Sequence, residues 1–246
     1  MSQVVLVTGA AQGLGADISR AFHRAGYRVA LGDVDEAGSA ALVEELDASG
    51  ETALAIGLDV RFEDQFERAR DVILAKWGAV HALVNNAVMT VAKPVLEITP
   101  EEFDQVMAIN VRGSFVASQV FGRVFKAAGY GRIVNIASLA GQNGGTATGA
   151  HYATSKGAII TLTKVFARDL AAFGVTVNAI APGPLDLPSV RRTVPPDRLP
   201  QLIAGIPVGA LGDATFVADI AVQLADPRAS FVTGATWDIN GGLFMR

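Results

Sequence analysis

The stretch Val4-Val5-Leu6-Val7-Thr8-Gly9-Ala10-Ala11-Gln12-Gly13-Leu14-Gly15 decides the fold. Its apolar, β-branched first half predicts a buried strand, and a helical stretch follows through His23. The glycines between them have the spacing Gly-x3-Gly-x-Gly, which allows backbone amides to approach a pyrophosphate closely, and the N-terminus of the next helix favours an anion. We therefore expect a dinucleotide to bind here, at Gly9, Gln12, Gly13, Leu14 and Gly15. A glycine turn that serves packing alone is the alternative.

The rest of the chain repeats this alternation of strand and helix. Further short apolar runs predict strands at residues 28–33, 53–58, 82–85, 132–137, 175–180 and 235–239. Such runs are typical of parallel strands that are buried on both faces and joined by right-handed crossovers. The predicted fold is α/β, a single Rossmann-type domain over residues 1–246, with a doubly wound sheet of about seven parallel strands and helices on both faces. We expect the Pro-rich segment 182–207 to form a loop or lid over a site.

The composition excludes several kinds of chemistry and partner. Half of the 246 residues are hydrophobic and 18% are charged, which excludes an unfolded chain. The absence of cysteine excludes disulfides, thiolate metal sites and cysteine nucleophiles, and we predict no metal site. A net charge of −4 without a compact basic cluster argues against nucleic acid and membrane as partners. With neither a signal peptide nor a spanning segment, the expected location is the cytoplasm.

Asp33 ends the second predicted strand and bears on the choice of cofactor. A carboxylate at this strand end can accept hydrogen bonds from both hydroxyls of the adenosine ribose and would repel a 2′-phosphate. No arginine or lysine lies in the glycine turn or directly after Asp33. This pattern favours NAD over NADP. The alternative interpretation is that Asp33 is a loop or cap residue.

Tyr152 and Lys156 form a candidate pair for proton transfer. They are four residues apart at the start of a predicted helix, so both side chains project from one face. A free phenol has a pKa near 10, and a nearby ammonium lowers this pKa toward the range in which proton transfer is efficient. Ser138 follows the predicted strand 132–137, at the carboxyl edge where open α/β sheets bind ligands. Its hydroxyl could hold a carbonyl or alcohol oxygen beside the tyrosine.

Together these motifs resemble the short-chain dehydrogenase/reductase family. The resemblance covers essentially the whole chain and includes Asn85-Asn86-Ala87, Asn110 in Ile-Asn-Val-Arg-Gly, Pro182-Gly183, Val232-Thr233-Gly234 and Asn240-Gly241-Gly242. It implies an oxidoreductase that uses NAD to interconvert a secondary alcohol and a ketone by hydride transfer.

The resemblance also implies a role for each matching residue. Tyr152 would be the general acid/base, Ser138 would orient and polarise the substrate oxygen, and Lys156 would bind the nicotinamide ribose and lower the Tyr152 pKa. Asn110 would hold a water molecule in a proton relay, although an asparagine that is simply buried is the alternative. The remaining cofactor contacts would come from Asp59 and Val60 at the adenine, Asn86 near the adenosine ribose, and the backbone from Pro182 through Gly183 to Leu185 at the carboxamide. His151 is a weaker candidate for proton transfer, because its position turns it to another face of the helix.

The chain departs from the family pattern in ways that affect the substrate more than the reaction. Val88 replaces a usual glycine, Leu187 replaces a common threonine, and the spacing from Ser138 to Tyr152 suggests an insertion within residues 141–150. The expected pocket is mostly apolar and suits a small neutral alcohol or ketone. Its predicted lining is Val88, Met89, Leu139, Ala140, Gln142, Asn143, Gly183, Leu185, Leu187 and Val190. Arg191 and Arg192 could instead clamp an acidic substrate.

The sequence leaves two alternative functions open, and it also bears on the oligomeric state. A ketoacyl reductase is an enzymatic alternative, which Asp33 disfavours because such reductases generally use NADPH. A dinucleotide sensor without catalysis is the alternative outside enzymes. The resemblance also implies a homotetramer or homodimer, with contacts through residues 110–127 and 152–173, the last strand and the tail.

Overall fold

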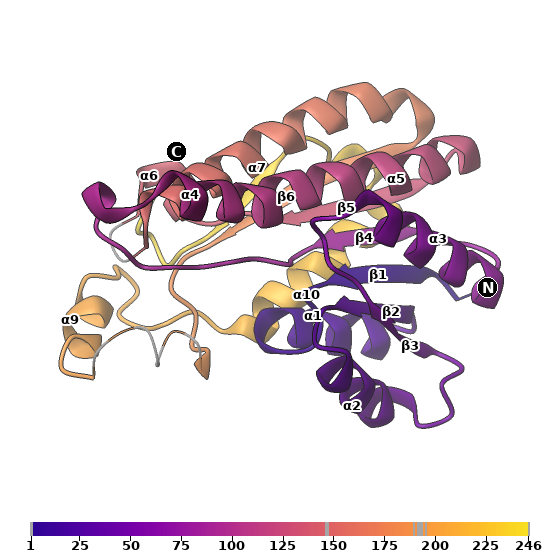
Figure 1. Ribbon diagram of the computed structural model, residues 1–246, viewed down its shortest axis with the longest axis horizontal. Coiled ribbons are helices and arrows are strands. Elements are labelled where there is room, and N and C mark those ends of the chain that lie inside the picture. Colours follow the sequence, from indigo (N-terminus) through magenta and orange to yellow (C-terminus); the bar gives the residue numbers. More distant parts are fainter. Residues whose placement is uncertain (1, 146–147, 189, 191–193, 195, 246) are drawn as a thin grey trace.

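Seven parallel strands form one sheet through the centre of the molecule (Figure 1). The computed structural model describes residues 2–145, 148–188, 190, 194 and 196–245. The strand order is β3-β2-β1-β4-β5-β6-β7. The bounds are β1 Val4–Thr8, β2 Arg28–Asp33, β3 Ala53–Gly57, β4 Ala82–Asn85, β5 Gly131–Ile136, β6 Val175–Pro182 and β7 Thr236–Ile239. The order reverses between β1 and β4, and this switch point is where open α/β sheets bind ligands.

Helices cover both faces of the sheet (Figure 1). On one face pack α1 (Gly13–Arg24), α2 (Glu36–Asp47) and α10 (Ala214–Ala225); on the other pack α3 (Glu63–Trp77), α5 (Gly113–Ala128) and α7 (Ala150–Leu170). Shorter helices are α4 (Pro100–Met107), α6 (Ala140–Asn143) and α9 (Leu199–Ala204), and the π-helical turn η2 (Ala108–Arg112) joins α4 to α5. The predicted doubly wound architecture is confirmed.

The first strand shows why these segments fold as they do. All five residues of β1 are buried, and its four apolar residues alternate between two cores. Val5 and Val7 pack against α1, α2 and α10, while Val4 and Leu6 pack against α3 and α5. Because successive side chains of a strand point to opposite faces, a run of apolar residues can satisfy two cores at once.

Four predicted strands differ from the structure by one or two residues at their ends. The third ends at Gly57, the fifth spans Gly131–Ile136, the sixth extends to Pro182, and the seventh begins at Thr236. The extension of β6 has a physical reason: Gly183 N donates to Ile239 O of β7 at 2.8 Å, so pairing continues to the strand end. The described part of segment 182–207 is not loop throughout, because it contains α9.

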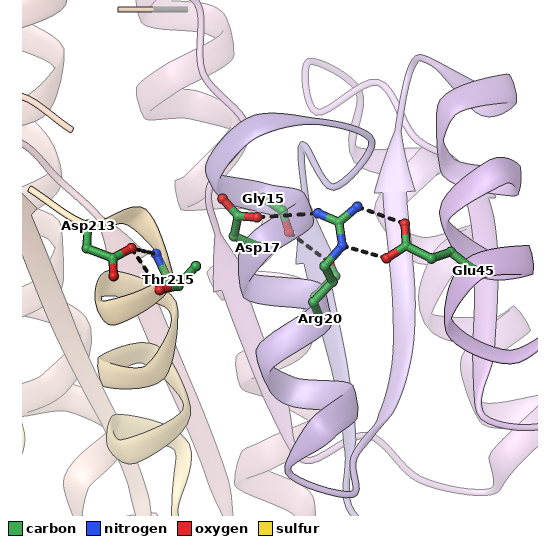
Figure 2. A network of polar contacts seen from close by, with 7 residues as sticks. Gly15, Asp17, Arg20, Glu45, Asp213 and Thr215 are labelled. Atoms are coloured by element: carbon green, nitrogen blue, oxygen red, sulfur yellow. Dashed lines mark hydrogen bonds and ion pairs between the residues drawn. The ribbon is translucent and has the colours of Figure 1, made fainter. Parts of the chain in front are cut away.

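Polar contacts fix helix α1 relative to its neighbours (Figure 2). Arg20 of α1 donates two hydrogen bonds of 2.8 Å to the carboxylate of Glu45 on α2, and a third of 3.3 Å to Asp17. Asp213 caps the N-terminus of α10, accepting from Thr215 N at 2.8 Å. A bidentate guanidinium–carboxylate pair fixes the relative orientation of the two side chains, even where exposure to solvent limits its contribution to the free energy of unfolding. The pair of Arg20 and Glu45 joins α1 to α2 and helps to define the orientation of the helix that follows the glycine turn.

Candidate active site

The glycine turn after β1 is held tightly against the end of β4. Thr8 Oγ1 accepts hydrogen bonds from the backbone amides of Asn86 (3.0 Å) and Ala87 (3.1 Å). The side-chain amide of Asn86 donates back to Thr8 O and Gly9 O at 3.1 and 3.0 Å. A Cβ on Gly15 would collide with the Gly9 carbonyl, so only glycine fits there. Asn86 therefore braces the turn with its side chain, a role that differs from the expected contact with ribose.

The N-terminus of α1 fits the phosphates of a dinucleotide. Gln12 precedes the helix in an extended conformation without a side-chain cap, and the first helical turn contains no acidic residue. The first amides of an α-helix have no acceptor within the helix, and they carry the positive end of its dipole. Gly13 has a φ of 56°, and a Cβ built there meets no atom within 4 Å, so the space beside the amides is open. These are the requirements for binding an anion through Gly13, Leu14 and Gly15.

Asp33 lies at the carboxyl edge beside this turn. One carboxylate oxygen accepts from Ala11 N at 2.9 Å and the other from Asp35 N at 3.0 Å. The residue is thus a local cap, as the alternative interpretation predicts. Each oxygen of a carboxylate has a further acceptor position, so the same side chain can still receive hydroxyl groups.

The two residues expected at the adenine point in different directions. Asp59 pairs with Arg61, whose Nε and Nη2 lie 2.5–3.0 Å from the carboxylate oxygens. The hydrogen bonds from Arg61 lower the pKa of Asp59. Val60 is buried and packs against Gly113, so its side chain belongs to the core and only its backbone can face a ligand.

The predicted catalytic residues come together at the carboxyl end of β5. The side chains of Ser138 and Thr90 lie near the Tyr152 hydroxyl, from the first turn of α7, and each lowers the pKa of the phenol. Ser138 Oγ also accepts from Ala140 N at 3.1 Å, and this bond fixes its position. Lys156 Nζ lies 5.8 Å from the centre of the Tyr152 ring and donates to Ile136 O at 2.6 Å. The pair shares one helix face, as its spacing predicts.

Burial dominates the electrostatics of this pair. Burial raises the pKa of Tyr152 above its ordinary value, and the side chains of Ser138 and Thr90 oppose this shift only in part. Burial also lowers the pKa of Lys156 to about 7. The expectation that Lys156 makes the phenol more acidic is therefore wrong for the protein chain alone, because desolvation is the largest influence on the pKa of each group.

Asn110 lies buried in the π-helical turn η2, where it joins two parts of the site. Its Oδ1 accepts from Met89 N at 2.8 Å, and its Nδ2 donates to Met89 O at 3.1 Å and to Ser155 Oγ at 2.9 Å. The alternative of a buried, backbone-satisfied asparagine is thus correct for the side chain. The side-chain amide of Asn110 is used by the loop and by Ser155, and its expected role in holding a water stays a prediction.

His151 points away from the reacting groups. The imidazole is fully buried, and its Nδ1 accepts from Tyr152 N at 3.0 Å. Its contact is with the backbone of Tyr152 and not with the phenol, in agreement with its position on another helix face. Sequence reasoning missed Thr90, since a lone threonine after the Asn-Asn-Ala motif carries no distinctive pattern.

The segment after β6 lies at the same edge of the sheet. Pro182 O accepts from Leu139 N at 2.9 Å, which ties this segment to the residue after Ser138. A Cβ on Gly183 would meet Asn240 Cα at 2.9 Å, so close packing explains the glycine. The Leu185 side chain is buried in the core with α10, and Leu187 packs against the same core. The buried Leu185 side chain is therefore a correction to the predicted pocket lining, whereas Leu187 is only partly buried.

The other predicted lining residues differ in exposure and in their contacts. Val88 is 46% exposed. Gln142 Nε2 donates to Asp238 at 2.6 Å, so that amide also serves to hold α6 against β7. Arg191 and Arg192 lie outside the described residues. Within the part of the chain that the structure describes, no group of three or more acidic or histidine side chains could hold a metal ion.

The sequence of this chain is similar to those of known oxidoreductases. A sequence model described as enoyl-(acyl carrier protein) reductase matches residues 9–244. The sorbitol dehydrogenase of Cereibacter sphaeroides is 34% identical over 254 residues, covering 99% of this chain and 98% of that protein. The chain belongs to the short-chain dehydrogenase/reductase family. As a member of this family it is an oxidoreductase that binds a nucleotide.

Two further proteins have a similar level of identity to this chain. The 3-oxoacyl-(acyl-carrier-protein) reductase of Staphylococcus epidermidis is 34% identical over 248 residues, covering 100% of both chains. A crystal structure of 3-ketoacyl-(acyl-carrier-protein) reductase from Brucella melitensis, complexed with NADH, superposes with a TM-score of 0.91 at 31% identity, covering 99% of this chain and 98% of that one. Among the described residues, no helix is long and apolar enough to span a bilayer.

Proposed function

We propose that this protein uses NAD to interconvert a secondary alcohol and a ketone. The observation that carries the proposal is that Ser138 and the buried Lys156 lie near Tyr152, at the same edge of the sheet as an uncapped helix N-terminus. Two hydroxyl groups at one point can hold one substrate oxygen, and the anion-binding turn lies at the same edge of the sheet. The arrangement suits the transfer of a proton at oxygen.

The protein residues would act on the substrate oxygen in the following way. Ser138, held by Ala140 N, donates a hydrogen bond to that oxygen and orients it. In alcohol oxidation Tyr152 accepts the hydroxyl proton, and in ketone reduction it returns a proton to the forming alkoxide. The protonated, positively charged form of Lys156 stabilises the phenolate of Tyr152. A bound nicotinamide would supply the hydride chemistry at the substrate carbon.

Asp33 supports NAD over NADP as the cofactor. Its carboxylate is fixed at the edge of the sheet by Ala11 N and Asp35 N, and the next residues are Val34, Asp35 and Glu36. A 2′-phosphate at this edge would meet several negative charges. The Brucella melitensis reductase complexed with NADH is consistent with this preference.

The cofactor preference is tested by calorimetric titration of NAD and NADP. We expect Asp33→Ala to weaken NAD binding about 10- to 100-fold, because two charge-assisted hydrogen bonds are lost, and to affect NADP far less. Asp47→Ala is the matched control, because Asp47 lies at the other end of α2 and accepts from Ser49 N and Thr52 N. Equal losses for both cofactors in Asp33→Ala would contradict the preference.

The substrate class is proposed from the site and the relatives. The similarity to a sorbitol dehydrogenase supports a small neutral alcohol or ketone, and the half-exposed Val88 supports an apolar entrance. Ketoacyl reduction remains a second candidate, because two of the similar proteins carry that activity in their names. Because the Brucella melitensis reductase is complexed with NADH, a preference of this protein for NAD does not argue against ketoacyl reduction.

A panel of substrates separates these functions. The full-length protein is incubated with NAD and secondary alcohols or polyols, or with NADH and a β-ketoacyl thioester, and the absorbance of the reduced cofactor is followed. Turnover of alcohols supports the proposal, and preference for the thioester supports ketoacyl reduction. Tight NAD binding without turnover of any substrate would indicate a sensor and contradict the proposal.

We propose a homodimer or homotetramer as the assembly. Phe115 on α5 and Val165 on α7 are 38% and 39% exposed, and the Phe115 ring lies 5.8 Å from the Phe166 ring. Large apolar side chains on neighbouring helices are typical of a surface that another protein covers. A second copy of this chain is the partner that the family resemblance supports.

A further inference from the structure

The histidine beside Tyr152 has one ring nitrogen with a partner and one without. The His151 side chain is fully buried, and its Nδ1 accepts a hydrogen bond from Tyr152 N at 3.0 Å. Among the described residues, its Nε2 has no hydrogen-bond partner. Because a nitrogen that accepts carries no proton, the ring is neutral and its single proton is on Nε2. His151 thus buries a donor without an acceptor, at the start of the helix that carries the phenol.

The accepting nitrogen of His151 serves as a cap for helix α7. The residue before the helix is Gly149, which has an extended backbone and no side chain that could accept from the first helical amides. Tyr152 N has no acceptor within the helix, since the first intrahelical bond runs from Ala153 N to Gly149 O at 3.2 Å. His151 Nδ1 supplies the missing acceptor. The end of a helix is the part that frays, and this is the turn from which the phenol projects.

The glycine before the helix makes room for the imidazole. A Cβ on Gly149 would collide with His151 Cε1 and would lie 2.6 Å from His151 Nδ1, so the ring occupies the place of an ordinary cap side chain. Gly149 N donates to Val91 O at 3.0 Å, and this bond holds the glycine itself in place. Helices commonly begin at Ser, Thr, Asp or Asn, whose side chains cap the first amides. Here a glycine and a buried histidine divide that task between them.

The backbone of Tyr152 is fixed on its carbonyl side as well. Tyr152 O accepts from Ser155 Oγ at 2.7 Å, and Ser155 Oγ accepts in turn from Asn110 Nδ2 at 2.9 Å. Side chains thus bind both backbone polar groups of the residue. A leucine or phenylalanine at position 151 would be apolar and would bury no unpaired donor, so the acceptor at Nδ1 is what the histidine adds.

We propose that His151 is a positioning residue, whose neutral imidazole caps the Tyr152 amide and thereby holds the phenol in place for the substrate oxygen. A displacement of about 1 Å at a reacting group can lower the rate about 100-fold, so a cap at this turn affects the rate beyond its effect on stability. The catalytic consequence of the cap rests on the proposed function, whereas the cap itself does not.

Two substitutions separate the roles of the two ring nitrogens. His151→Asn keeps an acceptor near the position of Nδ1, whereas His151→Gln places its amide near the position of Nε2 and loses that acceptor. His81→Gln is the matched control, because His81 Nδ1 also accepts from a backbone amide, Val4 N at 3.0 Å. His81 lies directly before β4, at the amino end of the parallel sheet, whereas the predicted catalytic residues lie at the carboxyl end.

We expect kcat for alcohol oxidation to fall about 10- to 100-fold in His151→Gln, because the first turn of α7 loses its cap and the phenol is displaced. His151→Asn should recover most of this rate, although both variants lose ring volume and should have a lower Tm than the wild type. His81→Gln should lower Tm and leave kcat unchanged. A wild-type kcat in His151→Gln, or equal losses in His151→Asn and His151→Gln, would overturn the proposal.

Two spectroscopic measurements read the cap without turnover. Nitrogen-15 NMR of the wild-type imidazole should show a proton on Nε2 of His151 and none on Nδ1. Hydrogen exchange at the Tyr152 amide should be faster in His151→Gln than in the wild type and slow again in His151→Asn. A proton on Nδ1, or equal exchange rates in all three proteins, would overturn the cap. If no substrate is turned over, the proposed function is contradicted, and the exchange rate of the Tyr152 amide by itself decides whether His151 holds this residue.

Discussion

Lys156 shows how strongly burial controls this site. Its ammonium is buried and donates to Ile136 O, and its pKa falls to about 7. In the unfolded chain the same group has a pKa near 10.4. Between these values the unfolded state binds more protons than the folded state, so the free energy of unfolding rises with pH from about 7 to about 10.

Lys156→Met tests this linkage, because methionine has a similar shape and no charge. In the wild type we expect the free energy of unfolding to rise by up to about 1.4 kcal/mol per pH unit, and we expect this rise to be absent in the variant. The variant should also be more stable than the wild type near pH 7. Urea unfolding at pH 7, 8 and 9 measures both effects. Parallel pH dependence in the two proteins would show that the lysine keeps its ordinary pKa.

Elements of regular structure were largely predictable, and the connections between them were not. Because β1 serves two apolar cores, its sequence predicts its bounds without error. The π-helical turn η2 was missed, since Ala108–Arg112 has an ordinary helical pattern and its extra residue per turn depends on contacts of Asn110 with a distant loop. For the same reason the spacing of Tyr152 and Lys156 predicts their shared face, whereas the pKa directions depend on burial that only the packed fold shows.

At the scale of the whole molecule, the exposed face of α5 and α7 leads to a prediction about assembly. Phe115→Glu places a charge among apolar side chains that a second copy would cover, so we expect the variant to dissociate into smaller species. Phe216→Glu on α10 is the matched control, because Phe216 is an exposed phenylalanine on the opposite side of the sheet. Light scattering during gel filtration gives the masses. A wild-type monomer, or the same assembly in Phe115→Glu, would contradict the proposed interface.

The most direct test of the account is the rate of NAD reduction by Tyr152→Phe with an alcohol that the wild type oxidises. Removal of one hydroxyl removes the proton acceptor, so we expect kcat to fall about 10²- to 10⁴-fold. The glycine turn is untouched by this change, so NAD should bind with an unchanged dissociation constant by calorimetry. A Tyr152→Phe enzyme that binds NAD and turns over at the wild-type rate would contradict the central role of this phenol.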